Sequence, residues 1–139
     1  MKDSSNFYNF VSCEANNGYQ ECPWAIKRVN STAGPNEDEG TTLSEAIRSP
    51  DSVPGETVVL WRDPDLKAGW QHKTSYKYQI VHLPDANLIR LKVWENGVLI
   101  VDSGDIIDDS EDSLKGGKLG VFCDSQEKVR WSALSYKCL

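Results

Sequence analysis

Four cysteines are the side chains of this chain best suited to form covalent cross-links. They are Cys13, Cys22, Cys123 and Cys138, and four cysteines allow three disulfide pairings. The Asn-Asn-Gly sequence at 16–18 is typical of a tight turn, which would bring Cys13 and Cys22 together. A bridge between Cys123 and Cys138 would close a loop of about 15 residues and stabilise the fold by about 3 kcal/mol.

A zinc site is the alternative use of four cysteines. The chain contains no Cys-x-x-Cys pair, however, and neither His72 nor His82 has the spacing of a zinc ligand. We therefore predict disulfides, which form in secreted and cell-surface proteins. The triplet Asn30-Ser31-Thr32 is an N-glycosylation sequon, so we predict Asn30 to carry a glycan in the same compartment.

A run of acidic residues follows the most apolar part of the sequence. Calcium binds several oxygen ligands that converge from a loop, and Asp102, Asp105, Asp108 and Asp109 are candidates for such a metal site. Their spacing is not that of an EF-hand. The alternative is a solvated acidic loop on the surface.

Tryptophan side chains offer a possible binding surface, because an indole ring is a large apolar plate with one polar edge. Trp70 follows a glycine in a predicted loop, and Trp94 shares a face of a predicted strand with Arg90 and Lys92. We predict that these four residues bind a ligand, either a protein or a glycan. Two other tryptophans, Trp61 and Trp131, are expected in the core.

Charge and residue types exclude several classes of function. The formal net charge of −6 argues against nucleic acid, because phosphate binding needs clustered Lys and Arg. No apolar stretch approaches the roughly 20 residues of a membrane helix, and the first 20 positions do not read as a signal peptide. A glycosidase needs two carboxylates about 5–10 Å apart across a cleft, whereas the acids here concentrate in predicted loops. We predict a protein that is not an enzyme, with His82 as a packing residue.

Apolar and polar residues alternate with the period of two that is typical of strands. An Asn-Gly pair at 96–97 between two such runs predicts a two-residue hairpin. A capping-box pattern at 42–45 predicts one short helix over 42–47. The predicted strands are 6–13, 24–29, 56–62, 75–83, 88–95 and 98–101, followed by two strands in the closing run 116–138.

These elements predict an all-β fold, a β-sandwich or jelly roll, with one incidental helix. At 139 residues the chain has the length of a single domain, which we assign to residues 1–139. Neither a linker nor an internal repeat interrupts it.

The order of several motifs resembles the C-terminal lectin-like domain of thrombospondins. The motifs are Val-Asn-Ser-Thr-Ala-Gly-Pro at 29–35, Leu-Trp-Arg-Asp-Pro at 60–64, Gly-Trp at 69–70, Asp-Ser-Gly at 102–104, and the closing run with Gly-Gly-Lys-Leu-Gly-Val-Phe at 116–122 and Ser-Gln-Glu at 125–127. The resemblance covers nearly the whole chain. It implies a concanavalin-like jelly-roll β-sandwich that is extracellular, associates with calcium, and binds receptors or matrix components. It also matches Asn30 to the family's glycan-bearing position.

The family's domain begins with further strands that this chain does not contain. They have been removed, are supplied by another chain, or are dispensable in a reduced sandwich. We therefore predict a secreted or cell-surface adhesion module that binds a receptor or matrix protein. A glycan-binding lectin is one alternative. An oligomeric or interaction subunit that completes its sheet with a partner's strand is the other.

Overall fold

The computed structural model describes residues 6–15, 21, 23–30, 51–66, 68–121 and 128–137. The regular structure in these residues is almost entirely β, as predicted from the alternating pattern. The predicted helix over 42–47 lies outside the described residues. The elements are β1 (Asn6–Val11), β2 (Ala25–Asn30), β3 (Thr57–Arg62), β4 (Tyr76–Leu83), the short 3₁₀ helix η1 (Pro84–Ala86), β5 (Leu88–Glu95), β6 (Val98–Asp102) and β7 (Ile106–Ile107).

The first sheet contains three antiparallel strands in the order β1-β2-β3. Its register pairs Phe10 with Ile26 and Ile26 with Trp61, and a bulge follows at the Ile26–Lys27 step of β2. Successive side chains of a strand point to opposite faces, so Tyr8, Phe10 and Ile26 all face the second sheet. The first sheet therefore contributes one apolar face to the interior.

The second sheet has the order β4-β5-β6, and β7 pairs with the start of β5. The predicted hairpin is confirmed. Asn96 and Gly97 have φ angles of 48° and 86°, the left-handed conformations that a type I′ turn requires. Strand β7 was not predicted, because two residues are too short to show periodicity.

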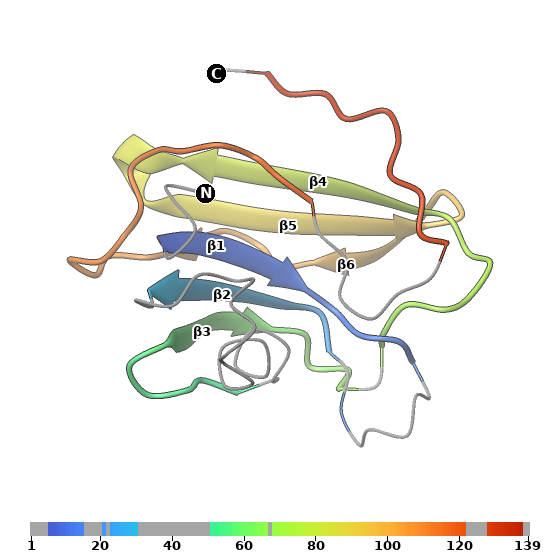
Figure 1. Ribbon diagram of the computed structural model, residues 1–139, viewed down its shortest axis with the longest axis horizontal. Helices are drawn as coiled ribbons and strands as arrows, with labels where there is room; N and C mark the ends of the chain where they lie inside the picture. The colour runs from blue at the N-terminus through green and yellow to red at the C-terminus, as the bar shows by residue number, and fades with distance from the viewer. Residues whose placement is uncertain are drawn as a thin grey trace.

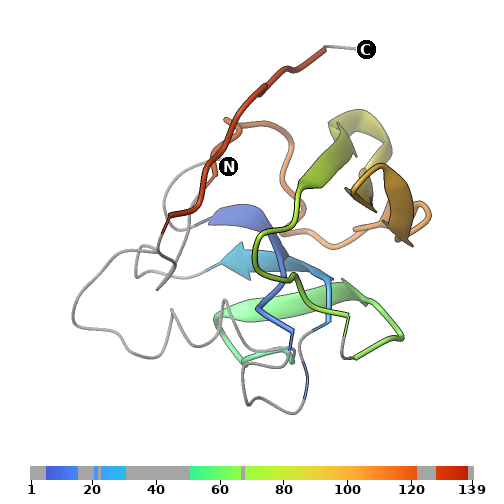
Figure 2. The same ribbon diagram turned by 90° about the vertical axis from the view of Figure 1, so that its right-hand side faces the viewer.

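The two sheets pack face to face around one apolar core (Figures 1 and 2). Its fully buried members come from the segment leading into β2, from β2 itself and from the β5–β6 hairpin: Trp24, Ile26, Ile89, Leu91, Val93 and Val101. The Trp24 ring contacts both Tyr76 and Tyr78 of β4. Burying each large apolar side chain stabilises the fold by about 1.5–3 kcal/mol, so this layer joins the two sheets. Trp61 is partly buried against it, as expected.

The closing run differs from the prediction. Among its described residues, 116–121 and 128–137, no strand is present. Trp131 is 48% exposed instead of buried in the core, and its ring lies 6.0 Å from that of Tyr78. In Figure 1 the segment 128–137 begins near the start of β4 and leads away from the sheets. An alternating sequence becomes a strand only where a neighbouring backbone supplies hydrogen bonds, and none of the described strands pairs with it.

Within the described residues, no helix is long enough and apolar enough to span a bilayer.

Candidate functional site

The second sheet has one buried and one solvent-facing side. Strand β5 buries Ile89, Leu91 and Val93, so the residues between them point away from the core. The register places Lys77 beside Trp94, Trp94 beside Leu99, and Lys92 beside Asp102. We call this side of the sheet the outer face; it consists of Lys77, Gln79, Arg90, Lys92, Trp94, Leu99 and Asp102.

Trp94 lies at the centre of the outer face and is held by a cation. The Lys77 Nζ atom lies 5.1 Å from the centroid of the indole ring, within the range of a cation–π interaction. The Lys77 ammonium group therefore lies over one face of the indole ring.

Arg90 and Asp102 form the charged part of the outer face. The guanidinium donates two hydrogen bonds to the Asp102 carboxylate, at 2.8 and 2.7 Å, and a third at 3.1 Å to Asp105. Asp102 also accepts from the Gly104 N–H, and Lys92 Nζ lies 3.6 Å from it. The hydrogen bonds from Arg90 hold the pKa of the Asp102 carboxyl well below its usual value. The same bonds raise the pKa of the Arg90 guanidinium.

Trp70 belongs to a different part of the molecule. Its backbone N–H donates to the Cys13 carbonyl at 2.9 Å, and its backbone carbonyl accepts from the Ala15 N–H at 2.7 Å. The ring is half-buried against the core and meets His72 edge-on. Of the four residues predicted to bind a ligand, the structure therefore brings together Arg90, Lys92 and Trp94, whereas Trp70 helps to join the end of β1 to the segment before β4.

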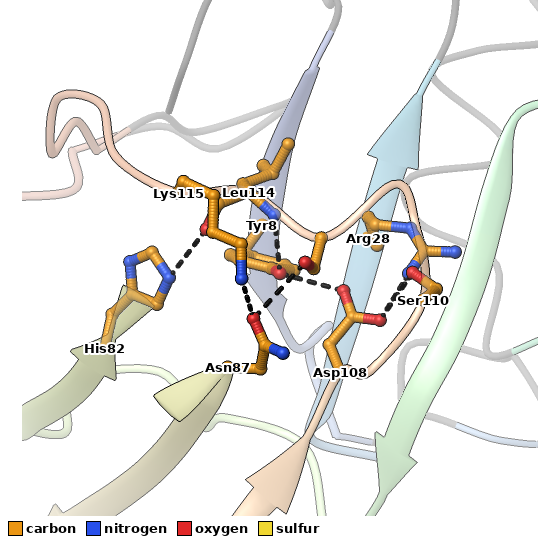
Figure 3. A network of polar contacts seen from close by, with 9 residues as sticks. Tyr8, Arg28, His82, Asn87, Asp108, Ser110, Leu114 and Lys115 are labelled. Atoms are coloured by element: carbon orange, nitrogen blue, oxygen red, sulfur yellow. Dashed lines mark hydrogen bonds and ion pairs between the residues drawn. The ribbon is translucent and has the colours of Figure 1, made fainter. Parts of the chain in front are cut away.

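Asp108 is buried between the sheets and is 3% exposed. Its Oδ1 atom lies 2.5 Å from an Arg28 Nη1 donor, and its Oδ2 atom accepts from the Tyr8 hydroxyl at 2.8 Å (Figure 3). Ser110 contacts both Asp108 and Arg28. Burial alone would raise the pKa of Asp108, but the bonds from Arg28, Tyr8 and Ser110 outweigh it and lower the pKa. Burial raises the pKa of Tyr8 to about 12, so its phenol remains a donor.

The same network continues into the second sheet. The Tyr8 oxygen accepts from the Leu114 N–H at 3.0 Å, while the Leu114 carbonyl lies 3.1 Å from His82 Nε2. The rings of Tyr8 and His82 meet edge-on with centroids 5.3 Å apart. Burial lowers the pKa of His82, outweighing the opposite effect of the Leu114 carbonyl. Tyr8 thus links β1, β4 and the segment after β7, and His82 is the packing residue that we predicted.

The four carboxylates considered for a metal do not share one site. Asp102 and Asp105 bind Arg90, Asp108 binds Arg28, and Asp109 is exposed. Across the part of the chain that the structure describes, no group of three or more His, Cys, Asp or Glu side chains is arranged to hold a metal ion. Calcium needs several converging oxygen ligands, so these residues do not fit a calcium site.

Three of the four cysteines, Cys22, Cys123 and Cys138, lie outside the described residues. The Cys13 Sγ atom lies 4.0 Å from the carbonyl oxygen of Glu21, next to Cys22 in the sequence. Asn30 is the last residue of β2 and is exposed. Its backbone N–H donates to the Glu56 carbonyl at 3.0 Å.

Comparison with known proteins matches residues 2–139 to the family model of the thrombospondin C-terminal region. The chain is 44% identical to human thrombospondin-3 over 113 residues, which are 81% of this chain and 11% of that protein. It is 37% identical to zebrafish thrombospondin-3b and 34% identical to bovine cartilage oligomeric matrix protein, covering 99% of this chain in both cases and 15% and 18% of the relatives. The chain therefore spans less than a fifth of the length of these relatives. It belongs to the thrombospondin C-terminal family.

Proposed function

We propose that this chain is a non-enzymatic, extracellular recognition module that binds a protein of the cell surface or matrix through the outer face. The observation that carries the proposal is the pairing of Trp94 and Lys77 at 5.1 Å on a hydrogen-bonded sheet. Tryptophan and arginine side chains, here Trp94 and Arg90 on one rigid strand, are typical of the energetic centres of protein interfaces. The relative named as a matrix protein supports an extracellular setting.

The pairing of Arg90 with Asp102 serves the same function. Two parallel hydrogen bonds fix the guanidinium, so little side-chain entropy is lost when a partner docks beside it. The exposed Leu99 adds apolar area next to Trp94. A partner with one apolar side chain and an acidic group facing Lys77 and Lys92 would match these features.

Further parts of the proposal concern covalent structure. We include a Cys13–Cys22 disulfide, supported by the contact between Cys13 and the Glu21 carbonyl, and a Cys123–Cys138 disulfide. We also include a glycan on the exposed Asn30 side chain. A single domain over residues 1–139 is supported by the core and the Tyr8 network, since both join the two sheets.

Cell attachment to the immobilised chain tests this function. We expect Trp94→Ala to reduce attachment about tenfold or more while leaving Tm within a few degrees of the parent, and Trp94→Phe to restore part of it. Tyr136→Ala is the control, because Tyr136 is an exposed aromatic residue of the closing run. Equal attachment by Trp94→Ala and the parent chain would contradict the proposal.

A glycan array separates the protein-binding function from the lectin alternative. If a sugar stacks on Trp94, Lys77→Ala should strengthen glycan binding by freeing the indole face. We expect no array signal that depends on Trp94. A signal that Lys77→Ala increases would favour the lectin.

A further inference from the structure

Strand β6 is an apolar edge strand, and no described strand pairs with its outer side. It is the last strand of the order β4-β5-β6 and forms the margin of the second sheet in Figure 2. Val98, Leu99 and Ile100 are 66%, 46% and 40% exposed, and the run Val98–Val101 contains neither a charge nor a proline. Natural proteins usually protect such an edge with charged residues, with proline or with a covering segment.

Two other edge strands have described segments beside them. The Val59 N–H of β3 donates to the Ser52 hydroxyl at 2.9 Å, so the segment before β3 folds back on that edge. Strand β4 is flanked by Leu114, which contacts His82, and by Trp131, which contacts Tyr78. For β6, the pairing found within the described chain is the ladder to β5. Among the edge strands that the structure describes, β6 is the one with three consecutive exposed residues.

The chemistry along this edge changes from apolar to acidic. After Val101 come six acidic residues within eleven positions; Asp102 and Asp105 bind Arg90, and the buried Asp108 binds Arg28. Asp109, Glu111 and Asp112 are exposed, as is the apolar Ile107. A strand that pairs antiparallel with β6 would place its first residues beside the acidic end and its later residues beside Val98–Val101.

We propose that β6 accepts an extended peptide segment of a partner protein as an added antiparallel strand, and that this segment is basic at its start and apolar thereafter. Main-chain hydrogen bonds to an open edge supply affinity, and alternate side chains supply specificity. The inference rests on the proposed recognition function and names the partner's chemistry. A second copy of the chain is a poorer match, because an antiparallel β6 of that copy would bring Glu95-Asn96-Gly97, which carry no positive charge, beside the acidic end.

A synthetic probe tests the edge directly. The peptide Lys-Lys-Val-Thr-Val-Thr-Val is titrated into the chain by calorimetry, with backbone amide shifts of β6 recorded by NMR. We expect saturable binding with shifts at Leu99 and Ile100. N-methylation of alternate peptide bonds should weaken binding about tenfold or more by removing donors, and replacing the lysines by glutamates should do the same through charge.

A matched pair of variants locates the site. Leu99→Lys should weaken peptide binding about tenfold, whereas Val129→Lys should not, although both side chains are exposed to nearly the same extent (46% and 47%). Equal effects of the two variants, binding insensitive to N-methylation, or shifts at β4 instead of β6 would overturn the proposal. So would a dimer in light scattering that Leu99→Lys abolishes, because the edge would then bind a second copy.

The peptide titration and the cell-attachment assay test the two proposals independently. Attachment that depends on Trp94, without binding of the peptide at β6, would overturn the edge proposal and leave the outer face as the recognition surface. Peptide binding at β6 without Trp94-dependent attachment would overturn the outer-face function and retain the open edge.

Discussion

The Tyr8 hydroxyl donates a 2.8 Å hydrogen bond to the buried Asp108 carboxylate, joining residues 100 positions apart in the sequence. Tyr8 lies on β1 of the first sheet, and Asp108 directly follows β7 of the second. The same carboxylate pairs with Arg28 of β2. One buried side chain therefore holds three segments, and the stability of the sandwich depends on its charge.

Asp108→Asn should destabilise the protein by about 3–5 kcal/mol. The amide would leave the Arg28 guanidinium, itself only 8% exposed, without its buried counter-charge. Urea unfolding followed by tryptophan fluorescence measures the change. Asp109→Asn is the control, since that neighbouring side chain is exposed and should change the free energy of unfolding by less than about 0.5 kcal/mol. Similar losses in both variants would show that Asp108 has no special role.

His82 should make stability depend on pH. Burial lowers the pKa of His82 in the folded state below 6.5, the usual pKa of a histidine. As the pH falls through about 6.5, the unfolded chain therefore binds more protons than the folded chain. We expect the free energy of unfolding to decrease between pH 7 and pH 5. His82→Gln should have a shallower dependence over this interval, measured by urea unfolding at each pH. Identical slopes would exclude His82 as the source.

Gly69→Ala should disrupt the connection between the end of β1 and Trp70. A Cβ atom at Gly69 would lie 2.3 Å from the Cys13 carbonyl oxygen and 2.7 Å from the Ala15 nitrogen, and both are backbone atoms that cannot rotate away. We expect a loss of at least about 1–3 kcal/mol in the free energy of unfolding. Gly116→Ala meets no atom within 4 Å and serves as the control. A Gly69→Ala variant as stable as this control would contradict the close approach.

Calcium should not act through the acidic segment at 102–108. The carboxylates of Asp102 and Asp108 are already bonded to arginines. Millimolar calcium should therefore shift Tm equally in the parent chain and in Asp102→Asn, as measured by calorimetry. A calcium-induced rise in the parent that Asp102→Asn removes would show that calcium displaces Arg90.

The local pattern of the sequence predicts most of the described strands. Alternation along 75–83 and 88–95 correctly identified β4 and β5, with Ile89, Leu91 and Val93 buried and Trp94 outside. The Asn-Gly turn placed the β5–β6 hairpin. These features depend on neighbouring residues alone, so periodicity and turn chemistry are sufficient to find them.

The closing run shows where this reasoning ends. Its alternation matches that of β4, yet its described residues form no strand, because a strand needs a hydrogen-bonding neighbour that local sequence cannot supply. The acidic run at 102–112 reads as one cluster in sequence. In the structure its members bind Arg28 and Arg90, which come from two different strands.

Local pattern thus predicts the all-β class, the hairpin and the face of β5 on which Trp94 lies. Three features appear only in the folded chain: the Lys77 ammonium lies over Trp94, Asp108 is buried against Tyr8, and no described strand pairs with the outer edge of β6. The difference is one of distance along the chain. Alternation and turns act between near neighbours, whereas a cation over an indole, a buried ion pair and an unpaired edge depend on which distant segments come into contact.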